Sequence, residues 1–319
     1  MSEAVVRVGI AGAGPWVELF HGPAFSRSDA TRLKGIWARR PEAAAALAGQ
    51  FQTQAFEDFD ALLDACDAVV VAVAPAAQPA LARRAAYAGK PLLLEKPLAQ
   101  DHSEATELVE ELEAAGVPTL VLLTSRFIPE VNDFLRSINR AAILGGRVAN
   151  LSDALLGGPF STSPWRHAEG ALADVGPHTI DLASSAFGAV SDLDADEEGG
   201  LTVLQLRHDS GAVSQLCLSL RVPGDPRFVL EVYGHDGARS LDVLALTRKA
   251  RERGDLTATV ARALADAARG RRGDYPDARH ALEAEWTIAR ARTKLEEQRK
   301  LMLGPQRVGA VQTTLEKEA

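Results

Sequence analysis

Short apolar segments alternate with helical segments over the first 123 residues of the chain. An apolar run of roughly four to eight residues between turn residues is typical of a strand that is buried on both faces. Strands that alternate with helices form a parallel sheet, because each helix carries the chain back across it. This half therefore predicts a doubly wound α/β domain. The expected strands are 5–10, 33–37, 68–74, 91–94 and 119–123, and the expected helices are 15–26, 42–49, 59–64, 78–88 and 103–115.

The hydrophobic period changes after residue 123. A helix is expected over 130–143, ending at Gly145 and Gly146. Strict alternation of polar and apolar residues then indicates strands with one solvated face, which is typical of an antiparallel sheet. The change of period predicts a domain boundary near residue 123. The expected strands of the second half are 201–207, 213–220 and 228–233, and further helices are expected at 256–268 and 277–298.

Composition excludes several classes of function. The 319 residues carry a net charge of -8, which argues against broad nucleic-acid binding. The basic run 269–272 is interpreted as a solvated loop. Cys66 and Cys217 lie far apart and outside any CxxC pair, so neither a zinc knuckle nor a redox motif is predicted, and no metal is expected.

The chain shows no targeting or membrane signal at this level. Its N-terminal residues lack a basic segment followed by an apolar run of signal-peptide length. The most apolar segment, 68–74, is too short to span a bilayer. We therefore expect a cytoplasmic protein without a membrane partner, whose two cysteines pack as small hydrophobic residues in a reducing compartment.

A glycine turn lies between the first expected strand and the first expected helix. Gly12 and Gly14 permit a tight turn and the close approach of a pyrophosphate to the helix N-terminus, which begins at Pro15 and Trp16. Val17 stands where the usual fingerprint has a third glycine. The turn predicts dinucleotide binding, and the alternative is a tight strand-to-helix turn without a ligand.

The end of the second strand suggests which dinucleotide is bound. NAD-binding proteins usually place an acidic residue there for the ribose hydroxyls. This chain has Trp37-Ala38-Arg39-Arg40 instead. Two guanidinium groups suit a 2′-phosphate, so NADP is preferred over NAD. The alternative is that Arg39 and Arg40 only solvate an exposed strand end.

The fourth apolar strand runs directly into Glu95-Lys96-Pro97. Ligands of open α/β sheets bind at the carboxyl ends of the strands, where this tripeptide stands. Pro97 restricts its own backbone and that of the preceding residue, so Lys96 is predicted to point in a defined direction. Ala74 and Pro75, at the end of the neighbouring strand, would meet the same ligand.

A second polar cluster lies at 174–181. If this segment opens a helix, Asp174, His178 and Asp181 share one face, and the two carboxylates should raise the pKa of His178. Trp165 and Arg166 are expected in a loop that lines the same cleft. An isolated His–Asp pair is more often structural. Arg126, just past the last strand of the first half, could reach the substrate or form a structural ion pair.

Together these motifs resemble the glucose–fructose oxidoreductase / inositol dehydrogenase (Gfo/Idh/MocA) family. The resemblance extends over essentially the whole chain and rests on Gly12–Gly14 with His21, on 88–91, on Glu95-Lys96-Pro97 and on 170–181. It implies a Rossmann domain over 1–123 and a C-terminal α+β domain over 124–319. The open, largely antiparallel sheet of the second domain would cover the nicotinamide and form the interface of a homo-oligomer, a dimer or tetramer.

The resemblance also implies the activity. The family's catalytic lysine, aspartate and histidine fall on Lys96, Asp174 and His178, so we expect an NAD(P)-dependent dehydrogenase or reductase for the CH–OH group of a sugar, cyclitol or similar polyol. Either His178 or Lys96 would transfer the proton. Two alternatives stay open: a lyase or hydrolase that regenerates a tightly held cofactor, and a non-catalytic NADP- or sugar-binding regulator, against which the complete set of three residues argues. The expected cofactor-binding residues are Gly12, Gly14, Pro15, Trp16, Arg39, Arg40, Ala74, Pro75, Glu95 and Lys96, and the expected substrate-binding residues are Arg126, Trp165, Arg166, Asp174 and His178.

Overall fold

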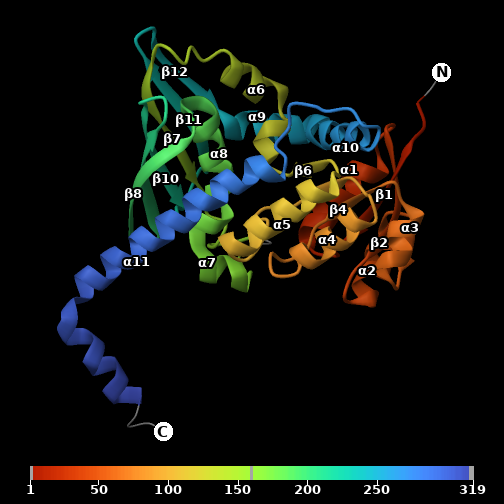
Figure 1. Cartoon of the computed structure of the whole chain (residues 1–319), viewed down its shortest axis with the longest axis horizontal. Coiled ribbons are helices and arrows are strands. Elements are labelled where there is room, and N and C mark those ends of the chain that lie inside the picture. The colour runs from red at the N-terminus through yellow and green to blue at the C-terminus, as the bar shows by residue number, and fades with distance from the viewer. Residues whose placement is uncertain (1–2, 159–160, 316–319) are drawn as a thin grey trace.

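Two lobes, each built on a six-stranded sheet, make up the protein (Figure 1). The structure is a computed structural model and describes residues 3–158 and 161–315. None of the described helices is both long enough and apolar enough to cross a membrane.

The first lobe contains a parallel sheet, sheet A, with the strand order β3-β2-β1-β4-β5-β6. The order reverses between β1 and β4, and an open α/β sheet binds its ligands at such a switch point. The predicted doubly wound sheet is therefore confirmed. Its strands are β1 (Val6–Ala11), β2 (Thr31–Trp37), β3 (Gln54–Phe56), β4 (Ala68–Val71), β5 (Leu92–Leu94) and β6 (Thr119–Val121).

The helices of this lobe begin and end within a few residues of their predicted bounds, and only the short strand β3 was not predicted. Asp101 caps the last of them, because its carboxylate accepts the backbone N–H of Glu104. Gly116 ends that helix in a left-handed conformation with φ 67°. The helices are η1 (Val17–His21), α1 (Gly22–Ser26), α2 (Pro41–Gln50), α3 (Phe59–Ala65), α4 (Gln78–Tyr87) and α5 (His102–Ala115).

The second lobe contains sheet B, with the order β12-β11-β7-β10-β9-β8. Only the β7–β10 pair is parallel among its described pairings, so the predicted largely antiparallel sheet is confirmed. Its strands are β7 (Ile143–Leu151), β8 (Val190–Glu198), β9 (Leu201–His208), β10 (Val213–Ser219), β11 (Arg227–Gly234) and β12 (Gly237–Asp242).

One predicted helix of the second half was wrong. The helix expected over 130–143 is only α6 (Pro129–Arg136), and the chain enters strand β7 at Ile143. Gly145 and Gly146 therefore lie inside a strand. A Cβ atom at Gly145 would lie 2.0 Å from a backbone oxygen of β10, and one at Gly146 would lie 2.1 Å from a backbone oxygen of β11. The neighbouring strands require these glycines, and no helix ends there.

The polar cluster at 174–181 falls across two helices that cover one face of sheet B. Helix α7 (Pro164–Asp174) is kinked at Gly170, which has φ 71°, and α8 (Gly176–Phe187) follows after a single residue. Both helices pack against β10, and α8 also packs against β7 and β11. The segment that contains Trp165 and Arg166 is thus a helix, and the expected loop was wrong.

The chain then returns to the first lobe. Helix α9 (Val243–Arg253) leads into α10 (Asp255–Ala268), which packs against α1, β2 and β4 of sheet A. One hydrophobic core consequently runs from sheet A through α10 to sheet B, and a second core lies on the opposite face of sheet A under α3, α4 and α5. The first lobe is therefore completed by residues from the C-terminal third of the chain.

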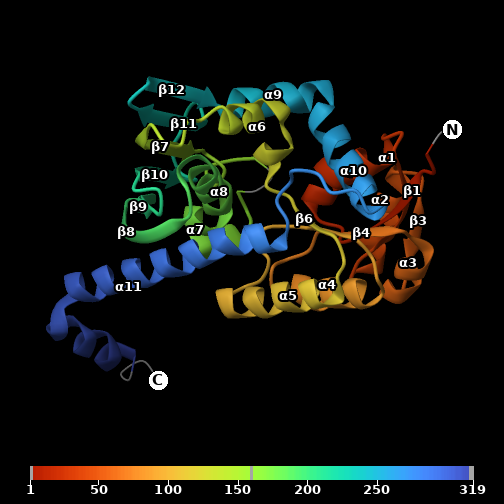
Figure 2. The same cartoon turned by 45° about the horizontal axis from the view of Figure 1, so that its top comes forward.

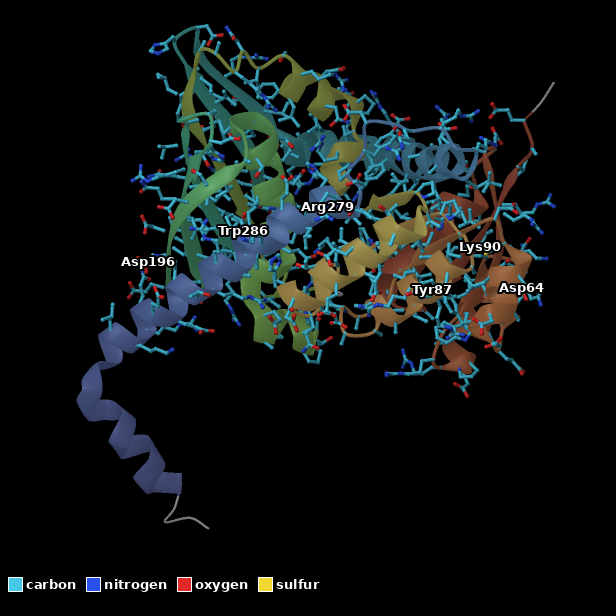
Figure 3. All side chains as sticks on the ribbon, in the orientation of Figure 1. Asp64, Tyr87, Lys90, Asp196, Arg279 and Trp286 are labelled. Atoms are coloured by element: carbon cyan, nitrogen blue, oxygen red, sulfur yellow. The ribbon has the colours of Figure 1, made fainter. Side chains whose placement is uncertain are left out.

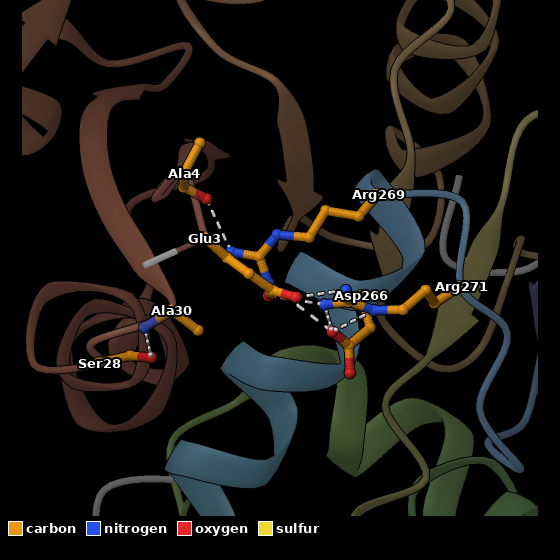
Figure 4. Close-up of polar contacts among 7 residues, drawn as sticks. All are labelled: Glu3, Ala4, Ser28, Ala30, Asp266, Arg269 and Arg271. Atoms are coloured by element: carbon orange, nitrogen blue, oxygen red, sulfur yellow. Dashed lines mark hydrogen bonds and ion pairs between the residues drawn. The ribbon is translucent and has the colours of Figure 1, made fainter. Parts of the chain in front are cut away.

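The end of α10 is tied to the N-terminal segment by ion pairs (Figure 4). Arg271 binds the Glu3 carboxylate at 2.6 Å and also pairs with Asp266, while Arg269 donates to the backbone oxygen of Ala4 at 2.7 Å. The basic run at 269–272, interpreted as a solvated loop, thus has a structural role at the edge of the first lobe.

The long helix α11 (Ala278–Leu315) connects the two lobes. It packs against α5 and β6 of the first lobe and against α8 and β8 of the second. Arg279 and Trp286 lie along this helix, and Trp286 is 38% exposed (Figure 3). The C-terminal part of α11 projects beyond both lobes (Figures 1 and 2).

Candidate functional site

A cleft of about 620 Å³ lies at the carboxyl ends of the central strands of sheet A. Both lobes contribute to it. Eleven of the predicted site residues line it: Gly14, Pro15, Trp16, Ala74, Pro75, Glu95, Lys96, Trp165, Arg166, Asp174 and His178. Gly12, Arg39, Arg40 and Arg126 do not line this cleft.

The glycine turn at one end of the cleft fits a dinucleotide. Gly12 has φ 134°, and a Cβ there would lie 2.1 Å from the backbone oxygen of Ala72, so only glycine allows β1 and β4 to approach this closely. A Cβ at Gly14 would meet nothing within 4 Å, which leaves open space in front of the helix N-terminus. Neither Ala13 nor Gly14 donates its backbone N–H to an acceptor in the described part of the chain. Such a cradle suits a pyrophosphate.

Val17, which replaces the third glycine of the fingerprint, is fully buried in the core. The helical turn that carries it has π geometry, and Trp16 stacks on Phe20 with ring centroids 4.9 Å apart. The first helix is therefore held by aromatic and aliphatic packing where the usual fingerprint relies on a small residue.

Arg39 and Arg40 follow β2 and are exposed. Neither forms an ion pair with a carboxylate among the residues that the structure describes. Their position after the strand next to β1 leaves both guanidinium groups available to an anion at this edge of sheet A.

The loop that carries Lys96 is held from below by Gln78, which is fully buried. The Gln78 side chain donates to the backbone oxygens of Glu95, Pro97 and Leu98 at 2.7, 3.0 and 3.1 Å, and its own oxygen accepts the Glu95 N–H at 2.9 Å. One amide thus contacts four backbone groups of the loop, with three oxygens sharing its two N–H hydrogens, and a residue 17 to 20 positions earlier in the chain fixes the backbone around Lys96.

Glu285, on α11, holds the same loop from another side. Its carboxyl accepts the backbone N–H of Leu98. Burial raises the pKa of Glu285 to about 8, so this carboxyl is mostly protonated at neutral pH. The role of Glu285 was not predicted from the sequence. Its signal was a carboxylate within an apolar helical stripe that includes Leu282 and Ile288.

Glu95 contacts the first helix through His21. The His21 Nε2 and the Glu95 Oε1 lie 2.6 Å apart, and His21 is fully buried. The other ring nitrogen of His21 has no hydrogen-bond partner in the described structure. This polar contact orients Glu95 at the edge of the cleft.

Lys96 meets the second lobe at Asp174. The Lys96 Nζ donates to the Asp174 Oδ1 at 2.8 Å and to the Asp174 backbone oxygen at 2.6 Å, and the Arg166 Nε donates to the Asp174 Oδ2 at 2.8 Å. Burial by itself would raise the pKa of Asp174. The charges of Lys96 and Arg166 outweigh it and hold that pKa below its ordinary value. Asp174 is thus a carboxylate shared by two cations.

His178 lies in the first turn of α8, after the break that separates it from Asp174. The two residues therefore do not share one helix face, as the sequence had suggested. The prediction that His178 has a raised pKa was also wrong. Burial and then the charge of Lys96 lower its pKa to about 3, and the opposing effects of Asp174 and Asp181 are smaller. His178 is neutral at physiological pH, and its buried Nδ1 has no partner within the described structure.

Asp181 points to different partners. Its Oδ1 accepts from Arg126 at 3.0 Å and from His280 at 2.5 Å, and Arg126 also binds Ser185 and Asn132. Arg126 has a largely buried side chain and does not line the cleft. The structural ion pair, which the sequence offered as one of two possibilities for Arg126, is present.

Trp165 and Arg166 lie at the start of α7, which Ser163 caps. The Arg166 guanidinium lies 5.7 Å from the centre of the Trp165 ring, so both side chains face the cleft together. No group of three or more His, Cys, Asp or Glu side chains that could hold a metal ion occurs among the described residues.

Comparison with known proteins identifies the family. Residues 6–122 match the oxidoreductase family with the NAD-binding Rossmann fold, and residues 147–239 match the GFO/IDH/MocA C-terminal domain. The chain belongs to the Gfo/Idh/MocA family. The resemblance inferred from the motifs is confirmed, and the N-terminal lobe is that of an NAD-binding oxidoreductase family.

Curated relatives are dehydrogenases of diols and sugars. The chain is 30% identical over 143 residues to trans-1,2-dihydrobenzene-1,2-diol dehydrogenase of Macaca fuscata fuscata, which covers 43% of this chain and 40% of that one. It is 30% identical over 206 residues to D-apiose dehydrogenase of Paraburkholderia graminis, which covers 58% and 54%. The chain thus spans about half the length of the curated relatives it matches.

Solved structures of the same fold cover nearly the whole chain. An NADPH-dependent oxidoreductase, described as putative, from Desulfitobacterium hafniense matches with a TM-score of 0.82 and 17% identity over 93% of this chain and 97% of that one. A protein from Sinorhizobium meliloti, described as a putative myo-inositol dehydrogenase, matches with a TM-score of 0.78 and 20% identity. The match covers 92% of this chain and 98% of that one. At such identities the match shows the fold alone.

Proposed function

We propose that the protein is an NAD(P)-dependent oxidoreductase that transfers a hydride between the nicotinamide and a CH–OH or keto group of a sugar, cyclitol or related polyol. One observation carries the proposal. Lys96 from the edge of sheet A and Asp174 from the second lobe meet at 2.8 Å in a cleft that also contains His178 and the open glycine turn. The family and its diol and sugar dehydrogenases support the same activity.

The nicotinamide, when bound, supplies the site that accepts or donates the hydride. Lys96 would donate a hydrogen bond to the reacting oxygen, stabilise negative charge on it and exchange its proton. A histidine whose pKa is about 3 accepts a proton poorly near neutral pH, so we give His178 the role of a neutral hydrogen-bond partner for the same oxygen. Asp174 would hold Lys96 in place. Arg166 and Trp165 would contact the rest of the substrate.

NADP is the proposed cofactor. Arg39 and Arg40 are exposed, and no acidic residue stands between Trp37 and Pro41, where an acid would bind the ribose hydroxyls of NAD. The other proposed cofactor contacts are the glycine turn, Ala74 and Pro75 at the end of β4, and Glu95 beside Lys96.

We also propose that residues 1–123 bind the dinucleotide and that residues 124–319 bind the substrate. The second region would also form the interface of a homo-oligomer, and the protein would be located in the cytoplasm. Exposed apolar side chains on the strands of sheet B support an interface there. They are Leu144, Leu201, Val213 and Tyr233.

The test begins with nicotinamide fluorescence, by titrating the protein with NADPH and with NADH. A panel of polyols and keto-sugars is then supplied with the preferred cofactor, and absorbance at the nicotinamide band is followed. We expect tighter binding of NADPH and a net change of absorbance with at least one member of the panel. A protein that purifies with tightly bound nucleotide and turns over substrate without net change would instead be the redox-cycling lyase or hydrolase. A protein that binds NADPH but transforms no member of the panel would contradict the proposal.

A further inference from the structure

Arg251 is a cation in the cleft that the family motifs do not include. It lies in the last turn of α9, beyond residue 239, where the match to the C-terminal family domain ends. Its guanidinium carbon lies 5.4 Å from the centre of the Trp16 ring, and both residues line the cleft. A residue of the second lobe thus reaches the helix N-terminus of the first.

The other charged side chains of the cleft already have partners. Lys96 and Arg166 share Asp174, and Glu95 is bound to His21. Arg251 forms no ion pair with any carboxylate among the described residues. Its guanidinium lies over the Trp16 ring. The lining of the cleft therefore carries more positive than negative charge before any ligand is bound.

Arg251 lines the same cleft as Lys96, Asp174 and His178. Protein atoms packed around its guanidinium remove water and lower its pKa, although the residue as a whole is exposed to the cleft. Its charge in turn contributes to the lowered pKa of His178. An arginine keeps its charge under such conditions, and a partly dehydrated guanidinium without a carboxylate is a strong site for an anion.

We propose that Arg251 binds an anionic group of the substrate, so that the enzyme acts on an acidic sugar derivative, such as a uronate, an aldonate or a sugar phosphate. This inference rests on the proposed dehydrogenase function. The guanidinium can bind a carboxylate or phosphate through two parallel hydrogen bonds. The anion would lie at Arg251 beside Trp16, and the carbon to be oxidised would be presented to Lys96 in the same cleft.

The pyrophosphate of the cofactor is the competing anion. The glycine turn offers it the unpaired N–H groups of Ala13 and Gly14 and the helix N-terminus behind them. Arg251 lies over the Trp16 ring and lines the same cleft as Lys96 and His178. The backbone cradle can hold the pyrophosphate without it.

The test is calorimetric titration of the protein saturated with oxidised cofactor. The probes are D-glucuronate, D-galacturonate, D-gluconate and D-glucose 6-phosphate, each beside neutral D-glucose or D-galactose. We expect at least one anionic probe to bind about tenfold or more tightly than its neutral counterpart. In Arg251→Gln that probe should bind about 10- to 100-fold more weakly, which is the usual effect of losing a charge-assisted hydrogen bond. Arg251→Lys should retain part of the affinity.

Arg248→Gln is the matched control, because Arg248 is exposed on the same helix and does not line the cleft. It should bind every probe as the parent does. The carboxylate and phosphate probes tell which kind of anion is preferred. Cofactor affinity is measured in parallel, and a loss in Arg251→Gln that is confined to the cofactor would assign Arg251 to the pyrophosphate and overturn the proposal.

Two other results would also overturn it: neutral sugars that bind as tightly as the anionic probes, and no binding by any anionic probe. Both leave the dehydrogenase function standing if a neutral polyol is oxidised. Conversely, Arg251-dependent binding of an anion without turnover would contradict the dehydrogenase function and leave the anion site in place. The two proposals therefore fail separately.

Discussion

The two walls of the cleft are held by different forces. On the first-lobe wall, the loop 95–98 is held by Gln78 and Glu285 through hydrogen bonds to backbone groups. On the second-lobe wall, Asp174 is held by the charges of Lys96 and Arg166, and His178 has a buried nitrogen without a partner. The loop 95–98 is thus held by hydrogen bonds to protein groups, whereas Asp174 is held by two charges for which a ligand can compete.

The position of Lys96 therefore depends mainly on hydrogen bonds to the backbone of its loop. A hydrogen bond between neutral groups stabilises the folded protein by about 1 kcal/mol, and a buried carbonyl or N–H that loses its partner costs about 1–3 kcal/mol. The loop is therefore costly to displace. The Lys96–Asp174 pair is also largely buried, with side chains 14% and 10% exposed, so its loss is costly as well, but a charged or polar ligand in the cleft can replace one of its partners.

The largest effect is expected where the two walls meet. Lys96→Met should lower turnover by roughly two or more orders of magnitude, because it removes the proton donor and the positive charge at the reacting oxygen. NADPH binding, measured by nicotinamide fluorescence, should be retained. Lys249→Met, at an exposed position on α9, is the control. Unchanged turnover in Lys96→Met would exclude Lys96 from the reaction.

Gln78→Leu tests whether the hydrogen bonds of Gln78 hold the loop 95–98 in the position that Lys96 requires. The change removes four hydrogen bonds from a buried site, so we expect the free energy of unfolding to fall by about 2–4 kcal/mol. The rate of turnover should fall by about tenfold or more because Lys96 loses its defined position. Chemical denaturation and steady-state kinetics measure the two effects.

Gln50→Leu provides the control for Gln78→Leu, since Gln50 is exposed at the end of α2. A Gln78→Leu protein that loses stability but keeps its full turnover would show that Gln78 supports the fold without positioning Lys96.

Glu285 makes the first wall sensitive to high pH. Folding raises its pKa from an ordinary 4.5 to about 8, so within this window the folded state holds a proton that the unfolded state has released. The stability from this group is fully present below pH 4.5 and is lost as the pH rises through about 8, at a slope of up to about 1.4 kcal/mol per pH unit. Denaturation of Glu285→Gln across this window should lack that slope. An equal slope in both proteins would contradict the assignment.

The smallest expected effect is a difference in pKa between His178 and His280. His178, with a pKa of about 3, should remain neutral from pH 5 to pH 9, whereas Asp181 raises the pKa of His280, which should titrate above its ordinary value of 6.5. NMR spectra of the histidine ring nitrogens, assigned with His178→Asn and His280→Asn, follow both. Titration of His178 near pH 6.5 would mean that its imidazole is more exposed to water than the structure shows.

The first lobe could be predicted closely because its strands are continuous apolar runs between glycines and prolines. The second lobe was predicted less completely. Strand β8 alternates Asp192, Asp194 and Asp196 with its inward residues, and only its pairing with β9 makes such an acidic segment a strand. Likewise Gly145 and Gly146 signalled the end of a helix, while the close approach of neighbouring strands was invisible in the sequence.

Some residues of the candidate site could be predicted from the sequence, and others could not. Lys96 could be proposed because it follows a buried strand at the edge of the sheet, and Asp174 and His178 because they match a motif of the family that the chain resembles. Glu285 could not, since it lies 187 residues from the Leu98 N–H that it binds. Arg251 comes from a helix that was not predicted at all. The pKa of His178 was misjudged because sequence spacing shows nearby charges and does not show burial.

Helix α11 packs on both lobes, and α10 returns from the second lobe to cover the first. A hinge motion that opens the two lobes would therefore require helix α11 to bend and the hydrophobic core shared through α10 to separate. We therefore expect cofactor and substrate to enter and leave through the mouth of the cleft without a large hinge motion of the two lobes. We expect the order in which the two molecules arrive to be governed by which one blocks that mouth.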